Sequence, residues 1–489
     1  GKEIFIKGGN AADAAVAAAF TLSVVEPSMS GLGGRLQAIY RNEEGLIGGI
    51  DASTEVPLSY NKTKGNKNYG YKTIGIPGVV AGLIKLHKEQ GSLPLETVMN
   101  PSIKYAEKGF EILPGESLRH ESQIKKLLEF KGTKYHFLKN NLNNYKPGEI
   151  FVQKDLAIIL KRISKKGHKG FYEGETAKKI VDDINKNSGY LSLEDLKNYK
   201  ALNSKILKGK FNNYNIYSLS LPSYGALTIQ ILQIMDQFNG LNNEEKWSVL
   251  IGKSTKLSYS FRHFQENNDS LKKILSYKEA KNYASMLLNN QYFNIKNVEI
   301  SENSGEKIGH TTHLTTADKY GNVVSLTQTI GPSMGSKVAT KGLGFLYAVT
   351  SGSYLGMYEP GKRVHSFISP TLIGNKKNII LALGGAGGNK IVTSIAQIAS
   401  RYFQQKKSLK EALFYPRVYP DKDTLLLENH IELNNLSLKL NSKNNLNYKY
   451  IEEKARFGRI HAVALDTINN LWIGAADPDW EGSVEILKK

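Results

Sequence analysis

Residues 1–200 carry apolar side chains mostly at spacings of three and four, which is the period of amphipathic helices. The alanine-rich stretch after Asn10 predicts a helix, which Asn10 caps with Asp13 three positions later and which Pro27 ends. Its many alanines permit close packing, so we expect this helix to be buried. Residues 94–200 are predicted to be mostly helical.

Short strands are predicted where the period changes. The segments 36–41 and 46–51 are the first two, and a helix that opens at Pro77 and closes at Gly91 follows them. Further along the chain, a strand-like stretch precedes an apolar helix at 226–238.

Beyond residue 310 short strands dominate the pattern. The segments 313–318 and 322–329 flank a turn in which Gly321 is able to take a positive φ, and this predicts a β-hairpin. Residues 300–310 before it have little apolar content, which is typical of a mobile loop.

Two further groups of elements complete the pattern. A buried strand at 378–383 runs into the sequence GGAGGNK and then into a helix at 391–403. Another strand pair is predicted at 459–466 and 471–477. Helices combined with antiparallel strand pairs predict an α+β fold or a layered αββα sandwich.

Composition narrows the classes of function. The chain has no cysteine, which excludes thiolate metal sites, disulfides and cysteine nucleophiles. Its net charge of +20 is typical of proteins that bind nucleic acid, but the lysines are scattered and mixed with asparagine. No helix-turn-helix, zinc-finger or RNA-recognition signature is present, so we predict no nucleic-acid partner. Apolar runs end before the roughly 18 residues of a membrane span, so no span is predicted.

Thr311 is the first candidate for chemistry, because it lies where the polar loop meets a predicted strand. A threonine hydroxyl is a weak nucleophile and needs an adjacent base. If the chain is cut before Thr311, the new α-amino group, with an ordinary pKa of about 7.7–8.0, supplies that base. The alternative, which the motif alone favours, is that Thr311, Thr312, Thr315 and Thr316 are strand threonines selected for β-branching.

The glycines at 384–388 form the second candidate. Their N–H groups can form an oxyanion hole or an anion nest after a strand. A phosphate loop is an alternative, but Asn389 separates Gly388 from Lys390, which breaks the Walker pattern, and GxGxxG spacing is absent. A tight structural turn is favoured over nucleotide binding. The GLGG sequence at 31–34 is likewise more typical of a packing turn than of a site.

Residues 360–371 form a third candidate, since Arg363, His365, Ser366 and Ser369 lie close together in the sequence. The alternative is a turn followed by an edge strand. The ten histidines show no metal-ligand spacing such as HExxH, so no metal site is predicted.

Six motifs follow one another along the chain: GGNAADAAVAAAFTLSVVEPSMSGLGG, GIPGVVAG, GHTTHLTTADKYGNVVSLTQT, PGKR with SPT, GGAGGNKI and GAADPDWEG. In this order they resemble the γ-glutamyltranspeptidase family from end to end. Members of that family are N-terminal nucleophile hydrolases with a four-layer αββα fold, so the resemblance implies that fold. It also implies that no metal or organic cofactor is needed.

The resemblance further implies that the precursor cuts itself between His310 and Thr311. The products are a large subunit of residues 1–310 and a small subunit of residues 311–489, which together form one intertwined domain. Thr311 then becomes the nucleophile, with its own amine as the general base.

Other site residues are implied in the same way. Thr329 matches a second threonine that hydrogen-bonds the nucleophile hydroxyl, and Gly387 and Gly388 match the glycines whose N–H groups receive the oxyanion. Ser366 matches the first of two serines that help to hold the substrate carboxylate. We predict a substrate contact from Arg363 as well.

One departure from the family pattern removes a charge. The family usually holds the glutamyl α-carboxylate with an arginine shortly after the Ile-Asp step that ends at Asp51. No arginine lies between Arg41 and Arg119, and Lys62 or Lys64 would be a poorer, point-charge substitute.

Other departures alter the rest of the substrate contacts. Phe367 stands in place of the second serine, and Gly331 in place of an asparagine two residues past the second threonine. The family has a run of residues that binds the substrate α-amino group, and AVTSGS at 348–353 stands at its position here. Within this segment Thr350 and Ser353 are predicted to contact the substrate. The short loop that follows predicts that the lid of many members is absent.

The reaction residues are thus intact while the glutamyl contacts are rewritten. We predict a self-processed enzyme like γ-glutamyltransferase or glutathione hydrolase, which cleaves a glutathione-like γ-glutamyl or related amide through a threonyl acyl-enzyme. The acyl group passes to water or to an amine such as an amino acid. An amidase for another acyl group and a binding protein without turnover are the alternatives. Bacterial relatives are commonly exported, so we expect a periplasmic or extracellular location.

Overall fold

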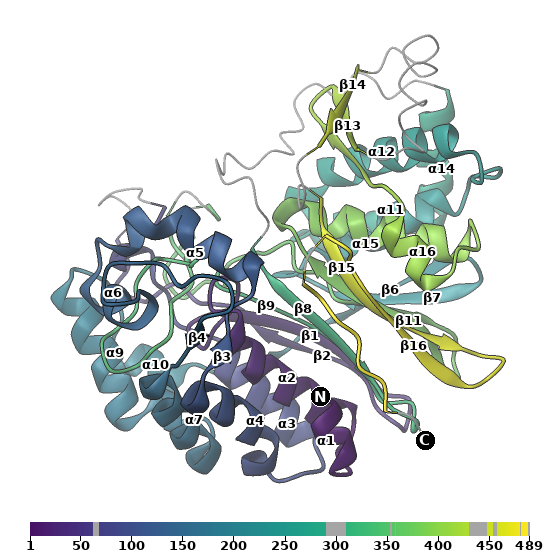
Figure 1. Cartoon of the computed structure of the whole chain (residues 1–489). Helices are drawn as coiled ribbons and strands as arrows, with labels where there is room; N and C mark the ends of the chain where they lie inside the picture. The colour runs from purple at the N-terminus through teal and green to yellow at the C-terminus, as the bar shows by residue number, and fades with distance from the viewer. Residues whose placement is uncertain are drawn as a thin grey trace.

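Two β-sheets face each other at the centre of the molecule, and helices cover the outer face of each (Figure 1). The computed structural model describes residues 1–61, 68–289, 310–352, 355–356, 358–429, 447–452, 457–479 and 481–487. The four layers have the order αββα, as the motifs imply.

The first sheet contains the strands that carry the candidate nucleophile. Its order is β5 (Leu202–Asn203), β2 (Ile47–Ala52), β1 (Arg35–Arg41), β9 (Val323–Thr329) and β8 (Thr312–Ala317). Strands β8 and β9 form the predicted hairpin, and Gly321 in its turn has φ +86°. Strand β1 pairs antiparallel with both β2 and β9, so it lies at the centre of the sheet.

The second sheet combines segments that are far apart in the sequence. Its order is β16 (Leu471–Ala476), β15 (Arg459–Asp466), β11 (Ile379–Ala386), β10 (Thr371–Gly374), β7 (Tyr214–Leu219) and β6 (Ile206–Phe211). Residues 360–370 form no strand, and β10, which begins at Thr371, lies between β7 and β11, so the edge strand considered for residues 360–371 is wrong. Strand β11 continues through Gly384 to Ala386, beyond the predicted end, because these residues pair with β15.

Smaller sheets complete the strands of the described residues. They are a three-stranded sheet of β12 (Val418–Asp421), β13 (Thr424–Glu428) and β14 (Asn447–Ile451), and a pair of β3 (Phe110–Glu111) and β4 (Ile150–Phe151).

Helices pack on the outer faces of both sheets (Figure 1). On the first sheet lie α2 (Ala11–Val25) and α3 (Val79–Gln90), and on the second lie α11 (Gly225–Met235), α15 (Ile391–Phe403) and α16 (Leu409–Phe414). The predicted cap of α2 is confirmed, because Asn10 and Asp13 form a capping box, and α2 is almost entirely buried.

The remaining helices enlarge these two outer layers. They are α1 (Lys2–Ile6), α4 (Leu95–Lys108), α5 (Pro114–Leu127), α6 (Lys131–Phe137), α7 (Lys154–Lys166), α8 (Lys169–Tyr172), α9 (Gly174–Lys186), α10 (Leu193–Asn198), α12 (Glu244–Ser260), α13 (Asn268–Ile274) and α14 (Tyr277–Leu288). Helices α4 to α10 confirm the helical region predicted at 94–200. None of the helices in the described part of the chain has both the length and the apolar content that a membrane crossing needs.

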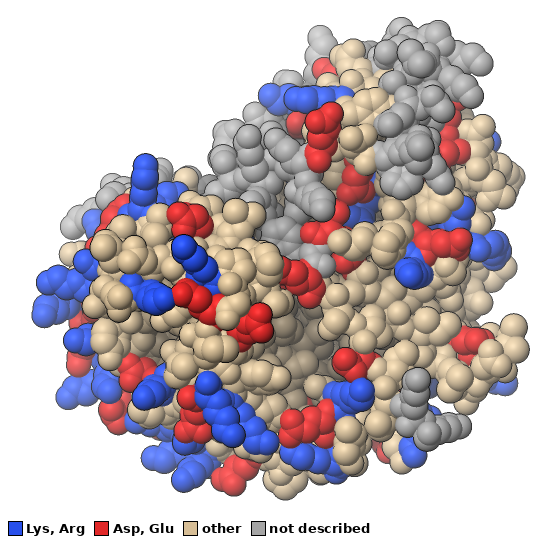
Figure 2. All heavy atoms as spheres, viewed as in Figure 1, with Lys and Arg blue, Asp and Glu red and all other residues tan. Residues whose placement is uncertain are grey.

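The space between the sheets is apolar in one part and polar in another. Ile39 and Val323 of the first sheet pack against Leu219, Leu372 and Ala382 of the second. Further along the same face, strands β1 and β9 present polar side chains instead, and this part holds the candidate site. On the outer surface, Lys and Arg are interleaved with Asp and Glu, as the scattered lysines of the sequence predict (Figure 2).

Candidate active site

Thr311 lies directly before β8 and is only 5% exposed. Its Oγ1 lies 3.2 Å from Oγ1 of Thr329 and also contacts the carbonyl oxygen of His310. The two threonines meet because Thr312 pairs with Gln328 in the ladder of β8 and β9, which brings the preceding residue opposite Thr329. The hydroxyl of Thr311 therefore lies against the peptide bond that is predicted to be cut.

The hydroxyl of Thr329 connects three backbone or side-chain groups at this point. It donates to the carbonyl oxygen of His310 at 2.8 Å and accepts a hydrogen bond from Gly331 N at 2.9 Å. It also accepts from the hydroxyl of Thr311. Because Thr329 is 2% exposed, these contacts are shielded from water and hold the three groups in fixed positions.

The predicted oxyanion glycines follow β11 and precede α15. Gly387 has φ +140° and Gly388 has φ +58°, which are conformations that favour glycine. A Cβ on Gly384 would lie 2.3 Å from the ring of His313, so the absence of a side chain lets β11 approach β8. Since His313 is two residues after Thr311, this contact brings β11, which leads into the glycine loop, toward the predicted nucleophile.

Two buried histidines, His313 of β8 and His461 of β15, lie between the two sheets near Thr311. His313 Nδ1 is 2.8 Å from Oγ1 of Thr327, and burial lowers its pKa well below the ordinary value, with a smaller contribution from His461. Burial also lowers the pKa of His461. Both rings are therefore neutral at neutral pH and act as packing and hydrogen-bonding groups rather than as charges.

The structure places Arg363 beside the end of β2 and Ser366 beside Pro222 and Ser223, after β7. Ser366 N donates to Pro222 O at 2.8 Å. The guanidinium of Arg363 forms an ion pair with Asp51 at 3.0 Å, donates to the carbonyl oxygen of Lys200 and lies 3.6 Å from the carboxylate of Glu55. In the intact chain Arg363 therefore ties neighbouring segments together, and its contact with substrate stays a prediction.

Thr350 lies in the segment 348–353 and is fully buried. Thr350 N donates to Thr73 O at 2.8 Å, whereas Oγ1 of Thr350 and Oγ of Ser351 have no hydrogen-bond partner among the residues that the structure describes. Ser353 lies outside the described residues, as do Lys62, Lys64 and all of the predicted loop except His310.

The sequence matches the model of the family described as Gamma-glutamyltranspeptidase over residues 1–487. The chain belongs to this family.

Relatives of known name support the assignment. The capsule biosynthesis protein CapD proenzyme of Bacillus anthracis is 29% identical, over 98% of this chain and 86% of that protein. The glutathione hydrolase proenzyme of Bacillus subtilis (strain 168) is also 29% identical, over 99% of this chain and 88% of that protein.

A solved structure shows the same fold. The cephalosporin acylase from Bacillus halodurans superposes with a TM-score of 0.87 at 22% identity, covering 99% of this chain and 93% of that one. The fold implied by the motifs is thereby confirmed. This γ-glutamyltranspeptidase family member is thus similar in sequence to a glutathione hydrolase proenzyme and in fold to a cephalosporin acylase.

Arg35 is a residue of this site that the sequence did not single out. It is the first residue of β1, is 1% exposed, and faces Thr329 across the β1–β9 ladder. Its Nη1 donates to Thr54 Oγ1 at 3.3 Å and to the carbonyl oxygen of Val349 at 3.2 Å. The available signal was a charged residue at the start of the strand sequence RLQAIYR, on the same strand face as Gln37 and Ile39.

Glu26 was missed as well. The carboxylate of Glu26 accepts a hydrogen bond from Oγ1 of Thr312 at 2.6 Å, so it contacts the residue next to Thr311. Burial raises the pKa of Glu26, while the charge of Arg119 lowers it. No pattern in the sequence indicates this contact, because the two residues are far apart along the chain.

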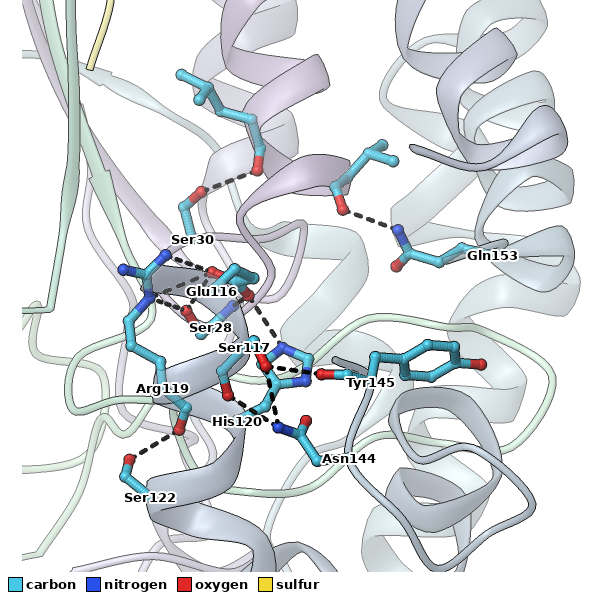
Figure 3. Close-up of polar contacts among 12 residues, drawn as sticks. Ser28, Ser30, Glu116, Ser117, Arg119, His120, Ser122, Asn144, Tyr145 and Gln153 are labelled. Atoms are coloured by element: carbon cyan, nitrogen blue, oxygen red, sulfur yellow. Dashed lines mark hydrogen bonds and ion pairs between the residues drawn. The ribbon is translucent and has the colours of Figure 1, made fainter. Parts of the chain in front are cut away.

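A buried ionic cluster supports the strand end from behind (Figure 3). The carboxylate of Glu116 accepts hydrogen bonds from Ser28, from Arg119 at 2.6 Å and from His120 at 2.9 Å. Burial alone would raise the pKa of Glu116, but the charge of Arg119 and these hydrogen bonds outweigh it and lower the pKa to about 2. The carbonyl oxygen of Ser28 in turn accepts from Met334 N at 2.8 Å, so the cluster anchors the loop after β9.

Among the residues that the structure describes, no three His, Asp or Glu side chains form a group that could hold a metal ion.

Proposed function

We propose that this protein is a self-processed hydrolase or acyl transferase, which cleaves a γ-glutamyl or related amide through an ester on Thr311. The observation that carries the proposal is the contact of Thr311 Oγ1 with both Thr329 and the His310 carbonyl group. Relatives named as glutathione hydrolase proenzymes support the reaction class and the processing.

Self-processing begins with attack of Thr311 Oγ on the carbonyl carbon of His310. The hydroxyl of Thr329 donates to the oxygen of that carbonyl group, so it stabilises the negative charge that develops there. The C–N bond breaks, the nitrogen of Thr311 takes the proton, and an ester remains. Water then hydrolyses the ester, which leaves a carboxylate on His310 and frees both the amine and the hydroxyl of Thr311. The products are residues 1–310 and 311–489.

The mature enzyme repeats this chemistry on an external amide. The free amine of Thr311 accepts the proton of its own hydroxyl as Oγ attacks the substrate carbonyl, and the N–H groups of Gly387 and Gly388 receive the oxyanion. The proton passes to the departing amine, and the acyl group stays on Thr311 as an ester. Water or a second amine then takes the acyl group and restores the hydroxyl.

An amidase for another acyl group is the second candidate. Phe367, where the family has its second serine, packs against Tyr224 with ring centroids 4.8 Å apart and against Tyr259 at 5.9 Å. An aromatic cluster in place of a hydroxyl favours a changed acyl group over the usual glutamyl group.

The periplasmic or extracellular location stays a prediction.

Two variants test the proposal. Wild-type protein and Thr311→Ala are incubated and their intact masses measured, and Thr315→Ala, on the same strand, serves as the matched control. We expect two fragments from the wild type and from Thr315→Ala, and one chain from Thr311→Ala. A wild type that stays uncut, or a Thr311→Ala variant that is cut before residue 311, would refute the mechanism. Incubation of the cut protein with a γ-glutamyl anilide should then add the acyl mass to the small fragment.

A further inference from the structure

Arg35 gives the site a fixed positive charge at a position that the family pattern does not predict. We propose that Arg35 binds a carboxylate on the acyl part of the substrate, so that the preferred donor is the monoamide of a short dicarboxylic acid, of the glutaryl type. This inference rests on the proposed function, because it names a substrate contact of the same site.

The strand register places Arg35 near the nucleophile. Arg35 pairs with Thr329 across β1 and β9, and Oγ1 of Thr329 lies 3.2 Å from Oγ1 of Thr311, the residue directly before β8. The three residues thus form one row across neighbouring strands. With about 4.8 Å between strands, the Cα atoms of Arg35 and Thr311 are about 10 Å apart. A short acyl group can therefore have its carbonyl at Thr311 while its far end meets the arginine side chain.

The guanidinium lies where three predicted substrate-binding segments meet. One contact is with Thr54, which lies three residues after Asp51. The family has its carboxylate-binding arginine in this segment, shortly after the position of Asp51. Thr54 O accepts from Val364 N at 3.2 Å, which brings Ser366 into the same region. Its other contact, the carbonyl oxygen of Val349, directly precedes the segment of Thr350. Arg35 thus supplies from β1 the charge that is missing after β2.

Two buried hydroxyl groups lie next to this contact in the sequence. Thr350 and Ser351 directly follow Val349, and neither Oγ1 of Thr350 nor Oγ of Ser351 has a hydrogen-bond partner among the described residues. Buried polar atoms are nearly always hydrogen-bonded in folded proteins, so these hydroxyl groups are donors that a bound carboxylate can satisfy. A carboxylate held by Arg35 can accept hydrogen bonds from the guanidinium N–H groups and from hydroxyl groups.

Glycines in the GLGG sequence make the arrangement possible. A Cβ on Gly33 would lie 2.3 Å from the carbonyl oxygen of Leu346, and Gly33 O accepts from Ala348 N at 2.9 Å. Only glycine lets the segment before Val349 approach β1 this closely. The packing turn predicted at 31–34 therefore brings Val349 to Arg35.

Arginine suits this task better than the lysines considered from the sequence. Its planar guanidinium can hold a carboxylate through two parallel hydrogen bonds and remains charged at all relevant pH values. Arg35, Thr311 and Thr329 are all nearly inaccessible in the uncut chain, so the contact requires the processed protein.

The test compares three anilides on the processed protein. Glutaryl and γ-glutamyl anilides carry the carboxylate, whereas pentanoyl anilide has the same chain length without it. We expect kcat/KM to be about 10- to 100-fold higher for glutaryl than for pentanoyl anilide, which is the range for a lost charged hydrogen bond. Arg35→Gln should reduce this preference, by raising KM for glutaryl anilide more than it raises KM for pentanoyl anilide.

Arg41→Gln is the matched control. Arg41 lies on the same strand and the same face, but its guanidinium donates to the carbonyl oxygens of Gly321 at 2.9 Å and Lys377 at 2.8 Å, at the other end of β1. We expect it to keep the wild-type preference. If Arg35→Gln is not processed, the wild-type ratio of kcat/KM for glutaryl to pentanoyl anilide alone tests whether the site prefers a carboxylate on the acyl group.

The outcomes separate this inference from the proposed function. Equal use of glutaryl and pentanoyl anilide by the wild type, with acyl-enzyme formed from both, would overturn the role of Arg35 and leave the threonyl mechanism in place. An equal loss on both substrates in Arg35→Gln would also overturn it, because that pattern reports a structural role. No acyl-enzyme from any of the three anilides would overturn both.

Discussion

Replacement of Thr329 by valine should slow self-processing without unfolding the protein. Valine has nearly the same shape as threonine, so the buried position stays filled while the hydroxyl is lost. The variant loses the hydrogen bond to the carbonyl oxygen of His310 at 2.8 Å and the contact with Thr311 Oγ1 at 3.2 Å. Both of these contacts involve groups that react in the proposed cut.

The expected magnitude follows from these two contacts. A hydrogen bond contributes about 0.5–1.5 kcal/mol, so their loss raises the barrier by roughly 1–3 kcal/mol. Since about 1.4 kcal/mol is a factor of ten in rate, processing should slow by about 5- to 150-fold. The N–H of Gly331, which donates to Thr329 at 2.9 Å, loses its acceptor, which costs roughly 1–3 kcal/mol of stability.

The assay follows the cut in freshly synthesised chain. Samples taken over time are separated on a denaturing gel, and intact mass identifies the new ends at residues 310 and 311. Thr327→Val is the control, because Thr327 is buried two positions earlier on β9 and its hydroxyl bonds to His313 at 2.8 Å instead. The reasoning is refuted if Thr329→Val, folded by circular dichroism, is cut as fast as the wild type, or if Thr327→Val slows the cut equally.

Other predictions concern stability and the glycine loop. Because the pKa of Glu116 is lowered to about 2 in the folded protein, its contribution to stability is present above its ordinary pKa of 4.5 and is lost as pH falls from there toward 2. Glu116→Gln should therefore destabilise the protein by about 3–5 kcal/mol at pH 7 and by less at low pH, measured by denaturant unfolding, with the exposed Glu121→Gln as control; an equal loss at all pH values would contradict this. Gly388→Ala should fold at a cost of about 1–2 kcal/mol, because no atom lies within 4 Å of its new Cβ, whereas Gly387→Ala would place Cβ 2.6 Å from Gly458 Cα and should cost more. Equal thermal midpoints for the two variants would show that the loop adapts more freely than its geometry indicates.

Local patterns predicted the layers of the fold but not all of its strands. The cap at Asn10, the hairpin around Gly321 and the helical region at 94–200 depend on short-range spacing, and the structure confirms each of them. Strand β6 escaped prediction because Lys208 and Lys210 alternate with buried residues and made the segment look like a solvated basic stretch. Its pairing with β7, rather than its own composition, makes it a strand.

The candidate site divides in the same way. The motif around Thr311 contains four threonines at positions that suit a strand, and nothing in their spacing distinguishes a nucleophile from a structural residue. The β8–β9 register separates Thr311 from the other three, because it brings Thr311 beside Thr329 and against its own preceding peptide bond, while its role as nucleophile stays a prediction. The family pattern predicted this pair, since the relevant residues lie within one hairpin.

The substrate contacts required the tertiary structure, because they join distant segments. Arg35 and Val349 are 314 positions apart, and their hydrogen bond depends on the glycines that let two backbones approach. The sequence shows only that an arginine is missing after Asp51. An arginine on one strand can place its guanidinium where relatives place that of an arginine from another strand. The absence of the motif arginine therefore does not show that the interaction with the substrate carboxylate is lost. For this chain, we therefore expect the charge in the site to select the acyl group. The ratio of kcat/KM for glutaryl anilide to that for pentanoyl anilide measures this selection.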